Sequence, residues 1–468
     1  MADIFPTISL KPPSKGVPGK PPNVEHRLPE SQSMLAKWQM IADCIAGQEA
    51  IKKAGTKYLP QPNPEDKSDA NVLRYQDYVT RALFFNVVSN TLSGLVGQVF
   101  NSDPVSEYPP ELEPLWYDAD GRGVTLIQQA KKALTTTLAA GFCGILVDYP
   151  VGLVDEAGKS IPFSRQDVID GIARPTLQYY GPFDIINWRF ESKGAVSQLT
   201  LLVLMEDYIL RDDGFEIQRG REYRVLRLVD GKYQVELWRR MDEEQEGPFS
   251  LHSISVPTDA NGQPFKSIPF FFIGAQNNDS QIDKPPMYDL ACINIAHYRN
   301  SADYEDSVYM VGQPTPYFAG LTQSWVDNVL KEKIQLGSRG AIPLPAGGSA
   351  GLIQAGENTM VKEAMESKER QMVSIGAQLV EDKQVQRTLG EAKMENAVVL
   401  STLSSCARNV SQAFESALIA AAMFAIGTVD KAKLIFKLST DFAIAKMSPE
   451  ERKALLASSL YGGAAARK

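Results

Sequence analysis

Cysteine and histidine side chains, which supply nucleophiles, general bases and metal ligands, are few in this chain and are spread along it. The four cysteines have no Cys-x-x-Cys spacing, and three of them lie in apolar runs typical of helices or strands. Buried free thiols are therefore predicted, rather than a disulfide set or a zinc site. The histidines are equally dispersed, so no histidine-based metal or catalytic cluster is predicted. The residues concerned are Cys44, Cys143, Cys292, Cys406, His26, His252 and His297.

Two other kinds of segment could hold a ligand. The glycine-rich segments 141–144 and 347–351 lack the spacing that places a lysine on the phosphates of a nucleotide, so they are interpreted as a strand turn and a surface loop. Acidic residues at 148, 155 and 156, and at 242–246, offer oxygen ligands that suit a hard cation. The second group is interpreted as a solvated turn, because consecutive carboxylates repel each other. We expect no catalytic residue, no metal and no cofactor, and hence a protein that is not an enzyme.

Length and charge limit the classes of function further. At 468 residues the chain exceeds one typical core, so two or three substructures are expected. The apolar fraction of 44% and the charged fraction of 22% are ordinary for a folded protein. The net charge is -8, whereas a protein that grips DNA by neutralising phosphates has a basic surplus. If DNA is a partner, we therefore expect it to pass the protein without being bound tightly.

Membrane and export signals are not predicted. The chain has no run of about eighteen uncharged apolar residues, and the nearest, 417–427, is too short to span a bilayer. The first residues, with Asp3 and three prolines by Pro13, lack the apolar core of a signal peptide. We expect no membrane partner and an origin in the cytoplasm.

The first 282 residues predict a body of the α+β class behind a proline-rich arm. Residues 1–30 hold seven prolines and few large apolar groups, so this arm has no core of its own and needs a neighbour to order it. Residues 31–141 show three helical apolar stripes, one of which is continuous from Tyr75 to Leu95. Residues 142–282 alternate as strands, and Asp230-Gly231 is a strong hairpin signal.

A different order of elements follows. An amphipathic helix over 287–310 leads into the Gly/Pro-rich segment 313–358, which contains one short helical piece at 324–334. A second helix is predicted over 360–379, then a polar link at 381–390, then a long apolar face that ends at Gly427. A strand at 433–438 and a helix beginning near Ser448 complete the chain. The pattern predicts a rod interrupted by a small insertion.

This order resembles the stem, clip, second stem helix, tunnel loop and following helix of the portal protein of tailed bacteriophages, the head-to-tail connector. Four segments, 38–47, 57–60, 81–86 and 144–150, resemble those of a portal-like subfamily formerly catalogued as a domain of unknown function. The resemblance implies an arm at 1–30, a wing at 31–282, a stem helix at 283–311, a clip at 312–358, a second stem helix at 359–380, a tunnel loop at 381–393, a long wing or crown helix at 394–427 and a C-terminal wing or crown segment at 428–468.

The resemblance also implies a function and partners. Portals are non-enzymatic rings of about twelve copies at one capsid vertex, and such a ring needs a heterologous, closed interface. Double-stranded DNA passes through the channel during packaging and ejection. The implied partners are further copies of the chain, the large subunit of the terminase motor, a head-tail adaptor and the major capsid protein, and the implied location is the virion.

Two groups of basic and polar residues are the candidate DNA-facing sites. In the implied tunnel loop, Lys383 and Arg387 can contact phosphate, and Gln384 and Gln386 can make weaker polar contacts. Along the implied second stem helix, Lys362, Lys368 and Arg370 are candidates to offset the negative field of the channel. The alternatives are an ordinary helix connection for the loop and an ion pair between Glu366 and Arg370 on the helix.

Two further functions stay open at this point. One is another virion component, such as a minor head or adaptor protein. The other is an enzyme that acts on nucleic acid or cell wall, with the β-rich body as its catalytic part. A ring of about twelve 51.5 kDa chains favours the portal, whereas a stable monomer with metal-dependent hydrolysis favours the enzyme.

Overall fold

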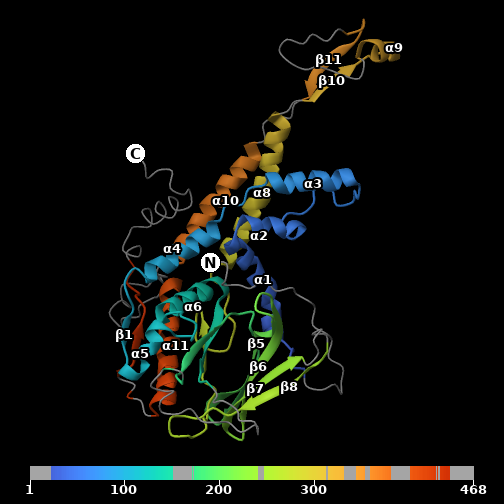
Figure 1. Cartoon of the computed structure of the whole chain (residues 1–468). Coiled ribbons are helices and arrows are strands. Elements are labelled where there is room, and N and C mark those ends of the chain that lie inside the picture. Colours follow the sequence, from blue (N-terminus) through green and yellow to red (C-terminus); the bar gives the residue numbers. More distant parts are fainter. Residues whose placement is uncertain are drawn as a thin grey trace, which may run out of the picture. The chain divides into compact units, whose positions relative to one another are not determined.

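The computed structural model (Figure 1) combines helices with antiparallel sheets, as expected for the α+β class. It describes residues 23–150, 171, 173–240, 247–312, 315–330, 344–353, 359–380, 401–427, 430 and 433–442. The chain divides into two compact units. Unit 1 comprises residues 1–47, 86–292 and 372–468, and unit 2 comprises residues 48–85 and 293–371.

The helices of unit 1 begin and end where the sequence supplies caps. In α6 (Leu126–Ala140), Thr125 and Gln128 form a reciprocal capping box, and Gly141 ends the helix in the left-handed region at φ 74°. A Cβ at Gly141 would lie 2.7 Å from the carbonyl oxygen of Asp283, so only glycine fits there. The other helices of the unit are α1 (Pro29–Ala46), α4 (Val87–Val99), the 3-10 turn η3 (Pro110–Leu112), α5 (Glu113–Tyr117) and α11 (Thr402–Ala425).

A three-stranded antiparallel sheet, β3-β2-β9, lies at the centre of unit 1. Its strands are β2 (Phe142–Asp148), β3 (Thr176–Tyr180) and β9 (Phe270–Gly274). Helix α11 packs on β2 and β9, and on its other side it contacts the small ladder of β1 (Val105–Glu107) with β12 (Ile435–Lys437). The sequence predicts the strand at 433–438 but not its partner β1.

A five-stranded antiparallel meander forms the second sheet of unit 1. The predicted turn at Asp230-Gly231 is present, and both residues have positive φ, 50° and 75°, as a type I′ turn requires. The strands are β4 (Ile185–Lys193), β5 (Val196–Asp212), β6 (Ile217–Val229), β7 (Lys232–Arg240) and β8 (Phe249–Ser255). The middle strands β5 and β6 are the longest of the sheet.

An ion-pair cluster joins the two sheets. The Arg224 guanidinium lies 2.5 Å from Asp148 Oδ2 and 3.0 Å from Glu206 Oε1, and the Tyr180 hydroxyl donates to the same Glu206 oxygen. Asp148, a candidate cation ligand from the sequence, is therefore satisfied by an arginine. Asp155, Glu156 and the acidic group at 242–246 lie outside the described residues.

The continuous helical stripe predicted from Tyr75 to Leu95 is wrong. The chain is extended at 82–86, which separates α3 (Asp69–Arg81) in unit 2 from α4 in unit 1. Asn86 caps α4 by accepting from the Ser89 amide at 3.2 Å, and the Leu83 amide donates to Ser301 Oγ at 3.0 Å. Tertiary hydrogen bonds therefore override a periodicity that runs through the break.

Unit 2 contains the helix, insertion and helix expected from the sequence. Helix α8 (Tyr288–Gly312) starts in unit 1 and continues through unit 2, and α10 (Thr359–Gln378) does the reverse. Between them, β10 (Thr315–Ala319) pairs antiparallel with β11 (Ser349–Ile353). The predicted helical piece at 324–334 is described as far as Leu330, with α9 (Gln323–Trp325) followed by a π-helical turn, η4 (Val326–Leu330). The short helix α2 (Gln48–Lys53) and the turn η2 (Gly55–Lys57) complete the unit.

Candidate functional site

A buried histidine joins the two long helices of unit 2. His297 of α8 is 1% exposed, and its Nε2 lies 3.3 Å from Glu369 Oε1 of α10. The edge of the Phe85 ring packs against the imidazole with 5.3 Å between centroids. Burial lowers the pKa of His297; the hydrogen bond and charge of Glu369 oppose this, and the charge of Lys368 adds to the lowering. In the sequence His297 is one of three dispersed histidines, and nothing there predicts Glu369 as its partner.

The three basic residues predicted on the second stem helix do not share one face. At 3.6 residues per turn, Lys362 and Arg370 lie roughly 80° apart around α10, and both are exposed. Lys368 is turned more than about 100° away from each of them, toward His297, and is half-buried. The structure therefore brings together Lys362 and Arg370 but not Lys368.

The exposed face of α10 has mixed charge. Glu363 and Glu366 lie beside Lys362 and Arg370, so the four charges on this face cancel. Among the described residues, no ion pair joins Glu366 with Arg370, so the predicted salt bridge is absent from this helix. A face with balanced charge is hydrated and does not attract or repel phosphate strongly.

The predicted tunnel-loop residues Lys383, Gln384, Gln386 and Arg387 lie outside the described residues. The two ends of their segment are described, however, and they meet. The Leu403 amide donates to the Leu379 carbonyl at 3.1 Å, and Ser401 caps α11 by accepting from the Ser404 amide. The described ends on either side of residues 381–400 are therefore adjacent.

Helix α3 and the segment after it are fastened along α8 by polar contacts. Arg81 Nη2 lies 2.8 Å from Asp306 Oδ1, and its guanidinium stacks 4.3 Å from the centre of the Tyr309 ring. The Tyr78 hydroxyl donates to Asp303 Oδ1 at 2.5 Å, and Arg299 Nε donates to the Tyr58 carbonyl at 2.7 Å. These contacts hold the C-terminal half of α8 in place. Because they join residues that are far apart in the chain, the sequence does not predict them.

The β10–β11 hairpin is a small structure with exposed apolar side chains. Tyr317 lies over Gly351, where an added Cβ would be 2.7 Å from the tyrosine ring and would displace it. Tyr317 is 44% exposed and Leu352 is 64% exposed. An isolated two-stranded hairpin is marginally stable in water, so this one needs a partner surface.

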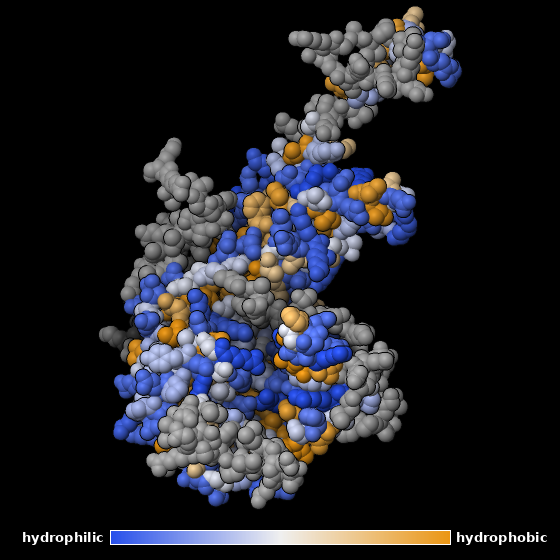
Figure 2. All heavy atoms as spheres, viewed as in Figure 1, coloured by the Kyte–Doolittle hydropathy of each residue, from blue (hydrophilic) through white to orange (hydrophobic). Residues whose placement is uncertain are grey.

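Unit 2 as a whole carries about half of the large exposed apolar side chains described, although it is the smaller unit. Figure 2 shows apolar surface near α3 and near the hairpin. Where such side chains gather into one patch, they favour interaction with another protein. The exposed residues are Val72, Leu73, Leu83, Phe85, Val308, Tyr309, Met310, Tyr317, Val326, Leu352 and Met360.

Three further observations concern function classes. Within the described ranges, no group of three or more histidine, cysteine or acidic residues is arranged to hold a metal ion. All four cysteines are free; Cys44, Cys143 and Cys406 are buried, as predicted. None of the helices described is both long enough and apolar enough to cross a membrane.

Comparisons with known proteins give three findings. The profile of a domain of unknown function, DUF4055, matches residues 286–425, which run from the start of α8 to the end of α11. No curated protein matches the chain in sequence. Among solved structures, a chain from the "Virion of native gene transfer agent (GTA) particle" is 12% identical with a TM-score of 0.37, covering 88% of this chain and 98% of that chain.

A second solved structure belongs to the same kind of particle. A chain from the "Neck of empty GTA particle computed with C6 symmetry" is 13% identical with a TM-score of 0.37, covering 79% of this chain and 89% of that chain. Likenesses this remote carry no argument about function, so the functional case has to come from the chain itself.

Proposed function

We propose that this chain is the portal subunit of a tailed bacteriophage or a similar particle. It forms a closed ring of about twelve copies at one capsid vertex, and double-stranded DNA passes through the ring during packaging and ejection. The ring acts as a conduit and docking platform, and a separate ATP-driven motor supplies the work.

One observation carries the proposal. The β10–β11 hairpin is inserted between α8 and α10, two long helices that contact each other through His297 and Glu369. A pair of helices with a small hairpin between them corresponds to the stem and clip of the resemblance. The segment 381–400, whose described ends are adjacent, and helix α11 follow in the order of the tunnel loop and the next helix.

The surface of unit 2 supports an assembled state. Its exposed apolar residues and its marginal hairpin gain stability only when other chains cover them. In the proposed ring, neighbouring subunits cover the helices, and the hairpin docks the terminase large subunit or the head-tail adaptor.

DNA contacts in the proposed ring fall on the loop rather than on α10. The exposed face of α10 is balanced in charge, so it neither holds nor repels the duplex strongly. Lys383 and Arg387, repeated around a ring, would supply weak, sequence-independent and salt-screened contacts to phosphate. Such contacts would hold the duplex loosely while it slides through the ring.

Negative-stain images of the purified chain test the proposal. We expect round particles with a central opening and rotational symmetry. Images that show only small, solid particles of monomer or dimer size would exclude the portal assignment.

A further inference from the structure

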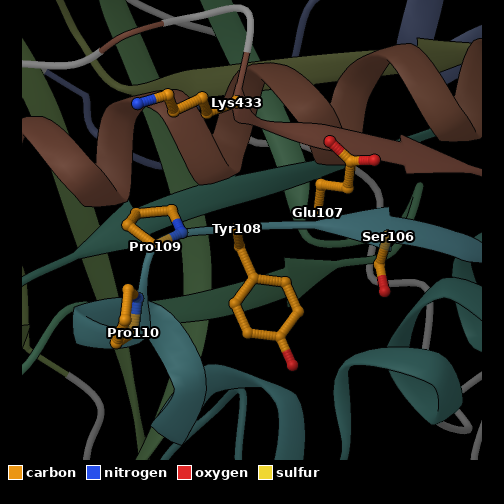
Figure 3. A pocket seen from close by; sticks show the side chains of 6 residues that line it. All are labelled: Ser106, Glu107, Tyr108, Pro109, Pro110 and Lys433. Carbon is orange, nitrogen blue, oxygen red and sulfur yellow. The ribbon is translucent and has the colours of Figure 1, made fainter.

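The described surface of unit 1 has an aromatic groove that the proposed function does not use. Ser106, Glu107, Tyr108, Pro109, Pro110 and Lys433 line it, and its volume is about 620 Å³ (Figure 3). The Tyr108 ring stacks on Trp116 with 5.5 Å between centroids and an interplanar angle of 26°. Stacked aromatic rings beside prolines are the kind of surface on which polyproline II segments dock.

The rim of the groove is acidic. Glu107 lines the groove, and Glu113 is near enough to Tyr108 that its charge, with that of Tyr117, adds to the effect of burial in raising the tyrosine pKa. Both glutamates are exposed. Lys433 is the basic residue of the lining, and its Nζ lies 4.0 Å from Asp430 Oδ2. The groove therefore suits a ligand that is rich in proline and carries positive charge.

The chain itself contains a segment of that composition. Residues 11–22 read Lys-Pro-Pro-Ser-Lys-Gly-Val-Pro-Gly-Lys-Pro-Pro, with three lysines and no acidic residue. A polyproline II helix has three residues per turn, so Pro12, Lys15, Pro18 and Pro21 fall along one edge of it. That edge offers proline rings to Tyr108 and Trp116 and a lysine to Glu113.

The described start of the arm lies away from the groove. Residues 24–28 are anchored on the outer face of the five-stranded sheet, where Val24 packs with Ile186 and Tyr223 and the Leu28 amide donates to the Ile186 carbonyl. The groove lies at β1, beyond the three-stranded sheet and α11, and Figure 1 draws β1 and β8 on opposite sides of unit 1.

The available length of chain favours another copy as the source of the segment. Pro12, the far end of the edge that would face the groove, is eleven residues from Asn23, which is about 34 Å of polyproline II chain. A unit of this length is roughly 50 Å across. The arm is therefore shorter than the width of the unit on which it is anchored.

We infer that the groove at Tyr108 and Trp116 binds the proline- and lysine-rich segment 11–22 of a neighbouring copy. This inference rests on the proposed ring, because each arm then reaches the next subunit in the same rotational sense. The exchange of arms is a heterologous contact that closes with the ring. It would link neighbours through unit 1, independently of the helices of unit 2.

A cysteine cross-link tests the source of the arm. The full chain carrying Gly19→Cys and Ser106→Cys is oxidised and run without reductant. We expect a ladder of covalent multimers, and each single variant, as control for the four native cysteines, should give no ladder. A disulfide confined to single chains would overturn the inference, as would the absence of any cross-link in assembled rings. If rings form without cross-links, the exchange of arms is contradicted and the proposed function stands. If no rings form, the proposed function itself is contradicted.

A peptide titration tests the chemistry. The receptor is the full chain with Pro18→Ala and Pro21→Ala, whose own arms bind weakly, and the probe is a labelled peptide of residues 11–22. Tyr108→Ala in the receptor should weaken binding at least about tenfold, and Val105→Ala, a 62% exposed neighbour on β1, should leave it unchanged. Peptide Lys15→Glu should also weaken binding, and receptor Glu113→Lys should restore it. Equal affinity for the Tyr108→Ala and Val105→Ala receptors, or no rescue by charge exchange, would overturn the inference.

Discussion

Removing the Arg81 side chain should loosen α3 from α8. Arg81 makes a 2.8 Å ion pair with Asp306 and stacks on Tyr309, and the two charged side chains are 25% and 23% exposed. A hydrogen bond to a charged group contributes about 1.5–3 kcal/mol. Solvent screening of this partly exposed pair reduces that figure, and the stacking adds about 0.5–1 kcal/mol. We expect Arg81→Ala to lower the free energy of local opening by about 2 kcal/mol.

Hydrogen exchange of the α3 amides measures this effect directly. A loss of about 2 kcal/mol corresponds to roughly 30-fold faster exchange where exchange follows local opening. Arg74→Ala is the matched control, because Arg74 is exposed on the same helix. A double-mutant cycle with Asp306→Ala should give a coupling energy of about 1 kcal/mol. Exchange in Arg81→Ala within twofold of the Arg74→Ala control, or a coupling energy near zero, would refute the reasoning.

Three further predictions concern pH, DNA and docking. Burial lowers the folded-state pKa of His297, so its contribution to stability is fully present above the unfolded pKa of about 6.5 and is lost as pH falls through the folded value. For each unit by which the folded pKa lies below the unfolded pKa, acidification should destabilise the parent by about 1.4 kcal/mol, and it should destabilise His297→Gln less. Equal loss of stability with falling pH in denaturation curves of the two proteins would contradict this. Lys383→Ala with Arg387→Ala should leave ring mass unchanged and reduce packaged DNA without preference for base sequence; normal packaging would remove these residues from the channel. Replacing residues 320–348 with Asn-Gly should keep the β10–β11 register and the rings but abolish capture of the motor or adaptor in a pull-down, and retained capture would place docking elsewhere.

Local signals in the sequence predict much of the fold. The Asp230-Gly231 turn and the strand within 433–438 are where the sequence places them, and Gly427 follows the end of α11 with φ 80°. Each of these depends on a few adjacent residues, so a single sequence contains the information. The break between α3 and α4 does not follow from local pattern, because Ser301 and Gln48 stabilise it from distant positions.

The candidate site is less predictable for the same physical reason. Periodicity identifies the apolar face of α10, but it does not show that Glu369 meets His297 or that Lys368 turns toward that pair. The pairing of Arg81 with Asp306 joins residues 225 positions apart. The aromatic groove depends on β1 pairing with β12, which brings Lys433 beside Glu107. Contacts of this kind are set by tertiary packing.

Native mass spectrometry of the purified full chain tests the central claim most directly. The proposed portal predicts one discrete species whose mass is a whole multiple, about twelve, of 51.5 kDa, and that persists on dilution to the micromolar range. A chain that stays monomeric or dimeric under those conditions would contradict the account.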